Sequence, residues 1–148
     1  MTGAPSQNTV DAWVRLVRAQ RVALSAVETA LKKAALPPLG WYDALLELER
    51  AGGDGMRPFE LEKRLLLPQY GLSRLLARLE AAGYVKRRPS RADARGQIVV
   101  INAAGRAVRA RMWPVYAAAL QAAIGDRLDD AEAGTLATLL GKIAPPHG

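Results

Sequence analysis

The segment from Met56 to Ile101 constrains the fold of this chain more than any other part of it. Its pattern predicts a short helix over 58–65, a tight connection, a second helix over 68–82 and a hairpin with strands at 84–89 and 97–101. Leucines at three- and four-residue spacing give both helices an apolar face: Leu61, Leu65, Leu72, Leu75, Leu76 and Leu79. The order helix, turn, helix and hairpin predicts a helix–turn–helix lobe with a wing.

The positive charge of the chain is concentrated in the same segment. Residues 56–95 contain four acidic side chains and ten basic ones, so they hold +6 of the net charge of +7 in 40 of the 148 residues. These basic residues form what we call the basic sector: Arg57, Lys63, Arg64, Arg74, Arg78, Lys86, Arg87, Arg88, Arg91 and Arg95. A basic sector in an otherwise balanced chain indicates a surface that faces phosphates.

Length and composition limit the class of protein. With 148 residues, half of them hydrophobic, the chain can bury a core as one domain, or as a small domain with an oligomerisation element. No apolar run approaches the ~20 residues that cross a bilayer. Residues 1–9 are small and polar and do not form a secretory signal. We therefore expect a cytoplasmic protein with no membrane partner.

Few side chains suit catalysis or metal binding. There is no cysteine, which excludes a disulfide framework, a thiolate metal site and thiol-based redox sensing. The only histidine is His147, in the proline-containing C-terminal tail. No nucleophile and base form a known motif, and the acidic residues are spread singly. We expect neither enzymatic activity nor a cofactor or a metal.

Long helices are predicted on both sides of the central segment. The N-terminal one runs from about residue 8 to residue 35, with Asn8 or Thr9 as its cap, and a further helix follows over 39–51. The apolar residues of the N-terminal helix recur at helical spacing: Trp13, Val17, Leu24, Val27 and Leu31.

The C-terminal part is predicted to be helical from residue 103 onward. Pro114 is expected to kink this helix, and Asp129 with Glu132 forms a capping box for the last one. Leucines and one isoleucine make an apolar stripe along it: Leu136, Leu139, Leu140 and Ile143.

The two terminal stripes are more apolar surface than a winged lobe alone can cover, which indicates an interface between two copies. We therefore expect an N-terminal dimerisation helix (8–35), a winged helix–turn–helix domain (36–101) and C-terminal dimerisation helices (102–144). The predicted fold class is mainly α with a small β wing.

Base contacts in such a lobe come from the start of its second helix. The candidates there are Gln69, Tyr70, Ser73, Arg74 and Arg78. Gln can pair bidentately with adenine and Arg with guanine, whereas Arg78 is expected to reach the backbone. Gly71 is expected inside this helix, where glycine costs about 1 kcal/mol relative to alanine. Either a close approach of DNA or another backbone explains it, or it is tolerated drift.

The hairpin supplies a second set of candidate contacts: Arg88, Arg91, Asp93, Arg95 and Gly96. An arginine on a narrow wing can enter the minor groove, where the potential is most negative. The carboxylate of Asp93 can orient the guanidinium of Arg95, two residues away. Alone, such a loop would be an exposed segment with an incidental ion pair, but it follows a helix–turn–helix and a basic strand.

These residues resemble the MarR family of bacterial transcriptional regulators over nearly the whole chain. The resemblance rests on the run from Leu72 to Val85, on Arg87-Arg88-Pro89 with Asp93-Ala94-Arg95-Gly96 in the wing, and on Ile101 to Arg106 at the start of the next helix. It implies a triangular homodimer that binds double-stranded DNA at a pseudo-palindromic operator. Such proteins are usually repressors, and many release DNA when they bind a small aromatic or phenolic ligand.

The chain departs from the family pattern in two ways. Leu66 and Pro68 stand where many members have a glycine and a Ser or Thr cap, and the cysteine of the peroxide-sensing members is missing. Pro at a first helical position is nevertheless acceptable.

Aromatic residues are the candidates for a ligand site: Trp13, Trp41, Tyr42 and Trp113, with Tyr116 nearby in sequence. They can line a cleft for a planar molecule, or they can simply be core. If they are core, the alternative is a regulator that binds DNA constitutively, without a ligand. A further alternative is a winged helix used for protein contacts or RNA. The wing argues against RNA, because the A-form major groove is closed to side chains.

Overall fold

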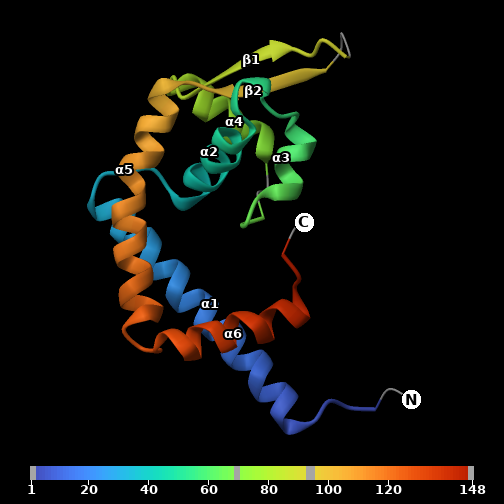
Figure 1. Ribbon diagram of the computed structural model, residues 1–148, viewed down its shortest axis with the longest axis vertical. Coiled ribbons are helices and arrows are strands. Elements are labelled where there is room, and N and C mark those ends of the chain that lie inside the picture. Colours follow the sequence, from blue (N-terminus) through green and yellow to red (C-terminus); the bar gives the residue numbers. More distant parts are fainter. Residues whose placement is uncertain (1–2, 69–70, 93–95, 147–148) are drawn as a thin grey trace.

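The computed structural model describes residues 3–68, 71–92 and 96–146 and is mainly helical. Its helices are α1 (Gln7–Lys33), α2 (Leu39–Ala51), α3 (Pro58–Arg64), α4 (Leu72–Ala81), α5 (Ala103–Leu120) and α6 (Asp130–Ile143). The strands β1 (Val85–Pro89) and β2 (Gln97–Ile101) form a two-stranded sheet. Figure 1 shows α2, α3, α4 and the sheet gathered in one lobe, with α1 and α5 leading away from it to α6. The predicted fold class is confirmed.

The core of the lobe lies where α2, α3, α4, β2 and α5 meet. Six of its side chains are almost completely buried: Leu45, Leu48, Leu61, Leu76, Leu79 and Val99. Val108 and Met112 extend this core along α5. Burying apolar side chains of this size stabilises the lobe by roughly 1.5–3 kcal/mol for each.

Polar contacts join the helices around that core. The first amide of α2 has no side-chain cap of its own, and Leu39 N donates instead to Oε1 of Glu28 in α1 at 2.6 Å. A carboxylate is favourable there because the N-terminus of a helix is electropositive. Glu49 of α2 forms an ion pair with Arg109 of α5.

The sheet is an antiparallel hairpin in which Val85 pairs with Ile101 and Pro89 with Gln97. Ahead of α3, Met56 adds a single antiparallel bridge to Val99 of β2. Gly55, which precedes this bridge at φ 69°, permits it, because a Cβ there would collide with Ile98 and Val99. β2 therefore contacts both β1 and the segment before α3.

The long helices α1 and α5 are each capped by a polar side chain at their first turn. α1 begins at Gln7, and its cap is Ser6, whose Oγ accepts from Thr9 N at 3.1 Å; the predicted caps Asn8 and Thr9 were wrong. α5 is capped by Asn102, whose side chain also donates to the Gly83 carbonyl at 2.7 Å. Asn102 thereby ties the start of α5 to the chain that leaves α4.

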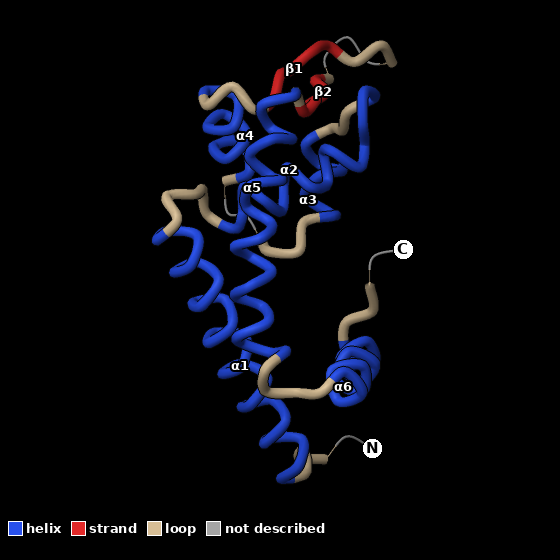
Figure 2. Tube along the Cα trace, turned by 60° about the vertical axis from the view of Figure 1, so that its left-hand side comes forward, coloured by secondary structure: helices blue, strands red, loops and turns tan. Residues whose placement is uncertain are grey.

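The C-terminal helix is held by its cap and makes little contact with the rest of the chain. Asp129 accepts from Glu132 N at 2.8 Å and Glu132 accepts from Asp129 N at 3.0 Å, so the predicted capping box is confirmed. Pro114 lies within α5, which continues to Leu120 and is followed by a π-helical turn over Gln121–Gly125. α6 crosses α1 in Figure 1 but stands apart from it in Figure 2, and none of its residues is buried.

None of the described helices combines the length and the apolar character that a bilayer-spanning segment needs.

The start of α4 differs from the prediction. The helix begins at Leu72 and not at Pro68, and Gly71 is its N-cap residue, not an interior one. Gly71 has left-handed backbone (φ 80°, ψ 51°), and its carbonyl accepts from Arg74 N and Leu75 N. Glycine is therefore explained by the backbone itself, since other residues rarely adopt this conformation. A side chain there would meet no crowding, because the nearest atom, Cβ of Arg74, would be 3.9 Å away.

We expect Gly71→Ala to lower the free energy of unfolding by about 1–2 kcal/mol, because alanine pays the left-handed penalty that glycine avoids. Chemical denaturation at one fixed protein concentration measures it. Gly53→Ala is the control, because Gly53 has neither positive φ nor a close neighbour. If Gly71 were inside the helix, alanine would instead stabilise the protein by about 1 kcal/mol, so the sign of the effect decides.

Candidate nucleic-acid interface

The helix α4 has one buried and one exposed face. Leu75, Leu76 and Leu79 point into the core of the lobe. Ser73, Arg74, Ala77 and Arg78 are exposed, so three of the five predicted contacts of this helix lie on its outward face. Gln69 and Tyr70 lie outside the described residues. The exposed face carries two guanidinium groups one turn apart, a spacing suited to phosphates or base edges.

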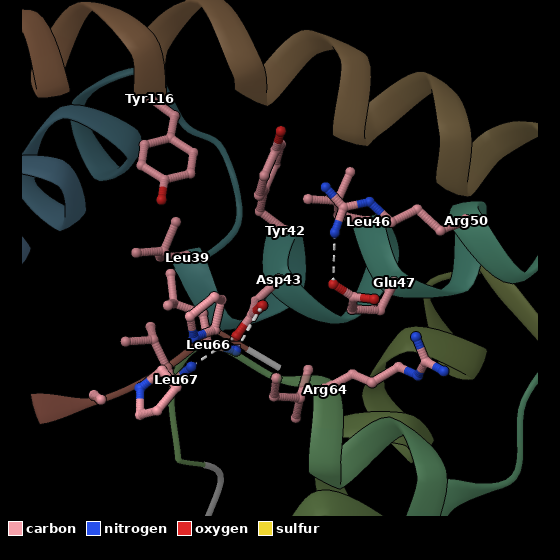
Figure 3. A pocket seen from close by; sticks show the side chains of 14 residues that line it. Leu39, Tyr42, Asp43, Leu46, Glu47, Arg50, Arg64, Leu66, Leu67 and Tyr116 are labelled. Atoms are coloured by element: carbon pink, nitrogen blue, oxygen red, sulfur yellow. Dashed lines mark hydrogen bonds and ion pairs between the residues drawn. The ribbon is translucent and has the colours of Figure 1, made fainter. Parts of the chain in front are cut away.

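A buried carboxylate from another helix holds the turn in front of α4. Asp43 of α2 is 7% exposed, and it accepts from Leu66 N at 3.1 Å through Oδ1 and from Leu67 N at 2.9 Å through Oδ2. Figure 3 shows the carboxylate directed at these two amides. It satisfies two donors that the short turn leaves without backbone partners, which fixes the path from α3 to α4.

Asp43 was not among the residues predicted to matter. The available signal was indirect. Leu66 and Pro68 replace the small and capping residues common in this turn, so the turn needed an acceptor from elsewhere. An acidic residue between Tyr42 and Ala44, on a helix with few polar residues on its inner face, was a candidate for that acceptor.

The wing is closed at its base by Ser90. Ser90 N donates to the Gly96 carbonyl at 2.9 Å, one step beyond the last pair of the hairpin. Arg91 is exposed, and Gly96 is half-buried at the other end of the loop. Asp93 and Arg95 lie outside the described residues, so their proposed pairing stays a prediction.

The arginines of β1 are engaged within the protein. Nη2 of Arg88 donates to the Gly53 carbonyl at 2.7 Å and to the Asp54 carbonyl at 3.3 Å. Nε of Arg87 lies 3.7 Å from Oε1 of Glu80 in α4. Arg88 therefore joins the wing to the loop after α2, in addition to its predicted contact with DNA.

The predicted ligand residues do not form one site. Tyr42, Trp113 and Tyr116 pack on one another, with ring centroids 5.1 to 6.2 Å apart. Trp41 contacts Tyr84 instead, with centroids 6.1 Å apart. Trp13 is 64% exposed on α1. Only Tyr42 of the four predicted residues lines the cavity described next.

A cavity of about 530 Å³ lies between α2, the α3–α4 turn, α5 and residues 144–146. Five leucines from α2 and the turn line it together with Tyr42 and Tyr116 (Figure 3), and four charged side chains border it as well: Asp43, Glu47, Arg50 and Arg64. The volume is in the range that holds a small organic molecule. Burial raises the pKa of Tyr116 above its usual value of 10, and the neighbouring Tyr42 and Asp43 raise it further. The Tyr116 phenol is therefore neutral at physiological pH and available as a hydrogen-bond donor.

Among the residues that the structure describes, no group of three or more His, Cys, Asp or Glu side chains is placed to hold a metal ion.

We expect Asp43→Asn to destabilise the protein by about 2 kcal/mol. Asp43 uses a different oxygen for each turn amide, and asparagine replaces one of these oxygens by an NH2 group, which faces an amide N–H and cannot accept from it. Denaturation measures the stability, and NMR hydrogen exchange at Leu66 and Leu67 measures the loss of protection. Glu47→Gln is the matched control: Glu47 lies one turn along α2, is similarly buried and lines the same cavity, but it pairs with the exposed Arg50. Equal effects of the two substitutions would show that Asp43 has no special role in the turn.

We compared the sequence and the structure of this chain with known protein families, curated proteins and solved structures. The model of the MarR family matches residues 36–96. No curated protein matches the chain in sequence.

Solved structures match nearly the whole chain. Sco3205, a MarR family transcriptional regulator from Streptomyces coelicolor in complex with DNA, has 25% identity and a TM-score of 0.86 over 97% of this chain and 90% of its own. A mutant of E. coli MarR complexed with operator DNA has 24% identity and a TM-score of 0.78, over 96% and 100%. Bordetella bronchiseptica BpsR, whose DNA binding is regulated by 6-hydroxynicotinic acid, has 22% identity and a TM-score of 0.81, over 97% and 100%. The winged lobe thus matches the MarR family, and the chain as a whole has the fold of that family's regulators.

Proposed function

We propose that this protein is a sequence-specific regulator of transcription that binds double-stranded DNA as a homodimer. The observation that carries the proposal is the exposed face of α4, where Ser73, Arg74 and Arg78 project from a buried leucine face. This helix lies beside a basic wing in the fold of Sco3205 and E. coli MarR, each of which has a structure with DNA. Of the net charge of +7, +6 belongs to this part of the chain.

In the proposed complex α4 enters the major groove and the wing reaches the adjacent minor groove. Arg74 and Ser73 then meet base edges, with Gln69 and Tyr70 as further candidates, and Arg78 binds the backbone. Arg91 and Arg95 follow the minor groove, where the potential is most negative. Phosphate contacts from both elements make the affinity fall steeply with salt.

The homodimer is supported by apolar side chains that the single chain leaves exposed. On α1 Trp13 is 64% exposed, and on α6 Leu139 and Ile143 are 51% and 71% exposed. A second copy related by twofold symmetry can cover both helices, which is the role proposed for residues 8–35 and 102–144. The lobes of 36–101 then present two α4 helices about 34 Å apart, the spacing of half-sites one turn apart in a pseudo-palindromic operator.

We further propose that the protein is a cytoplasmic repressor released by a small aromatic or phenolic molecule. The cavity beside Tyr42 and Tyr116 supports a ligand of this kind, since it combines an apolar wall with a neutral phenol. BpsR, which responds to 6-hydroxynicotinic acid, has the same fold. The alternative is constitutive DNA binding, and the mutual packing of Tyr42, Trp113 and Tyr116 favours it, because these rings already satisfy one another.

The test isolates an operator by selecting genomic fragments on the purified protein and compares the wild type with Arg74→Ala on single-base variants of that operator. We expect Arg74→Ala to weaken binding by about 1–3 kcal/mol and to remove discrimination at one base position in each half-site.

A uniform loss over all variants would show that Arg74 contacts phosphate alone. The proposed function itself is contradicted if the wild type enriches no fragment at low salt, or if sedimentation shows a monomer only.

A further inference from the structure

Arg57 and Ser90 form a contact, which we call the clamp, that joins the start of α3 to the base of the wing. Nη2 of Arg57 donates to Oγ of Ser90 at 3.2 Å, and Ala92 N donates to the same oxygen at 3.2 Å. Ser90 is 6% exposed, although it directly follows the exposed end of β1. Its hydroxyl therefore receives one donor from another element and one from the loop itself.

The same residue closes the loop through its backbone. Ser90 N donates to the Gly96 carbonyl at 2.9 Å, so the segment that carries Arg91 leaves and rejoins the hairpin at a hydrogen-bonded pair. Together the three bonds set the direction in which Arg91 and Ala92 leave the sheet. A buried hydroxyl with two donors directed at it has few alternative arrangements, because losing either bond leaves a donor unpaired.

The other end of the contact is held equally firmly. Arg57 is the N-cap residue of α3, and its carbonyl accepts from Glu60 N and Leu61 N at 3.0 Å each. The preceding residue, Met56, bonds to Val99 of β2 in both directions, at 3.0 and 2.9 Å. The backbone that carries the Arg57 side chain is thus anchored to α3 on one side and, through Met56, to β2 on the other.

Exposure separates Arg57 from the arginines placed to meet DNA. Arg57 is half-buried, whereas Arg74, Arg78 and Arg91 are exposed. We infer that Arg57 and Ser90 are positioning residues for the wing: they act on DNA binding by directing the wing arginines and do not contact DNA themselves. This inference rests on the proposed function, because it assigns part of the affinity for DNA to the direction of the wing.

The experiment is a double-mutant cycle on DNA affinity, measured by fluorescence anisotropy with an operator fragment that the wild type binds. Ser90→Ala removes the shared acceptor without changing any charge, and we expect it to weaken binding about tenfold. In a background with Arg91→Ala and Arg95→Ala, which removes both arginines of the loop between β1 and β2, the effect of Ser90→Ala should fall below about twofold. In an Arg74→Ala background it should remain about tenfold, because α4 does not depend on the clamp.

Salt dependence gives a second readout that loss of stability alone would not change. Ser90→Ala should lower the slope of log affinity against log salt by about one, although it removes no charge, because a wing arginine loses its phosphate. Arg57→Met should reproduce the loss, and it should add little to Ser90→Ala, since the two remove the same bond. Ala4→Ser, which is exposed and lies outside the dimerisation helices and the winged lobe, is the control and should bind like the wild type.

An unchanged affinity for Ser90→Ala would overturn the inference, and so would a tenfold loss that persists without the wing arginines. Failure of the wild type to bind any DNA would count against the proposed function instead, and the clamp is then judged by NMR hydrogen exchange. Faster exchange of the backbone amides of residues 90 and 92 in Ser90→Ala supports the clamp, whereas unchanged exchange contradicts it.

Discussion

The carboxylate of Asp43 is the interaction on which the position of α4 depends. The turn between α3 and α4 contains leucines and a proline, and these side chains cannot accept from its amides. Asp43 accepts from Leu66 N and Leu67 N and links the turn to α2, whose neighbours are buried in the core. Without this acceptor the two part-buried amides would lose their hydrogen-bond partner on folding, so Asp43 fixes the turn to α2.

The same carboxylate forms part of the wall of the cavity beside Tyr42 and Tyr116. A molecule in that cavity therefore lies against the side chain that holds the turn before α4. α2 is joined to α5 through Glu49 and Arg109, and to α1 through Glu28 and the Leu39 amide. The lobe and the long helices are thus connected through α2, the element that also borders the cavity.

Local signals in the sequence predicted the elements well. The bounds of α2 and β2 and the capping box of Asp129 and Glu132 are as predicted, because each depends on residues a few positions apart. Gly71 was wrongly predicted to lie inside the helix. The residues before it suit a helix or a turn equally, and the left-handed backbone that shows Gly71 to be the N-cap cannot be read from the sequence. Ser6 was missed as a cap by two positions, an error typical of helix ends.

The contacts that shape the candidate site could not be predicted in this way. Asp43 acts on a turn 23 residues further along the chain, and Arg57 meets Ser90 across 33 residues. Neither pair belongs to a periodic pattern of residues from which its contact could be predicted. The basic sector likewise showed only its total charge. The structure divides it into exposed arginines such as Arg74 and Arg91, and arginines engaged within the protein, such as Arg57, Arg87 and Arg88.

The most direct test of the whole account is hydroxyl-radical and methylation footprinting of the wild type on its selected operator. Two symmetry-related α4 helices and two wings predict major-groove protection at two centres about 10 base pairs apart, with minor-groove protection on the outer side of each. A single unsymmetrical patch of protection, or protection of the backbone with no groove contacts, would contradict it.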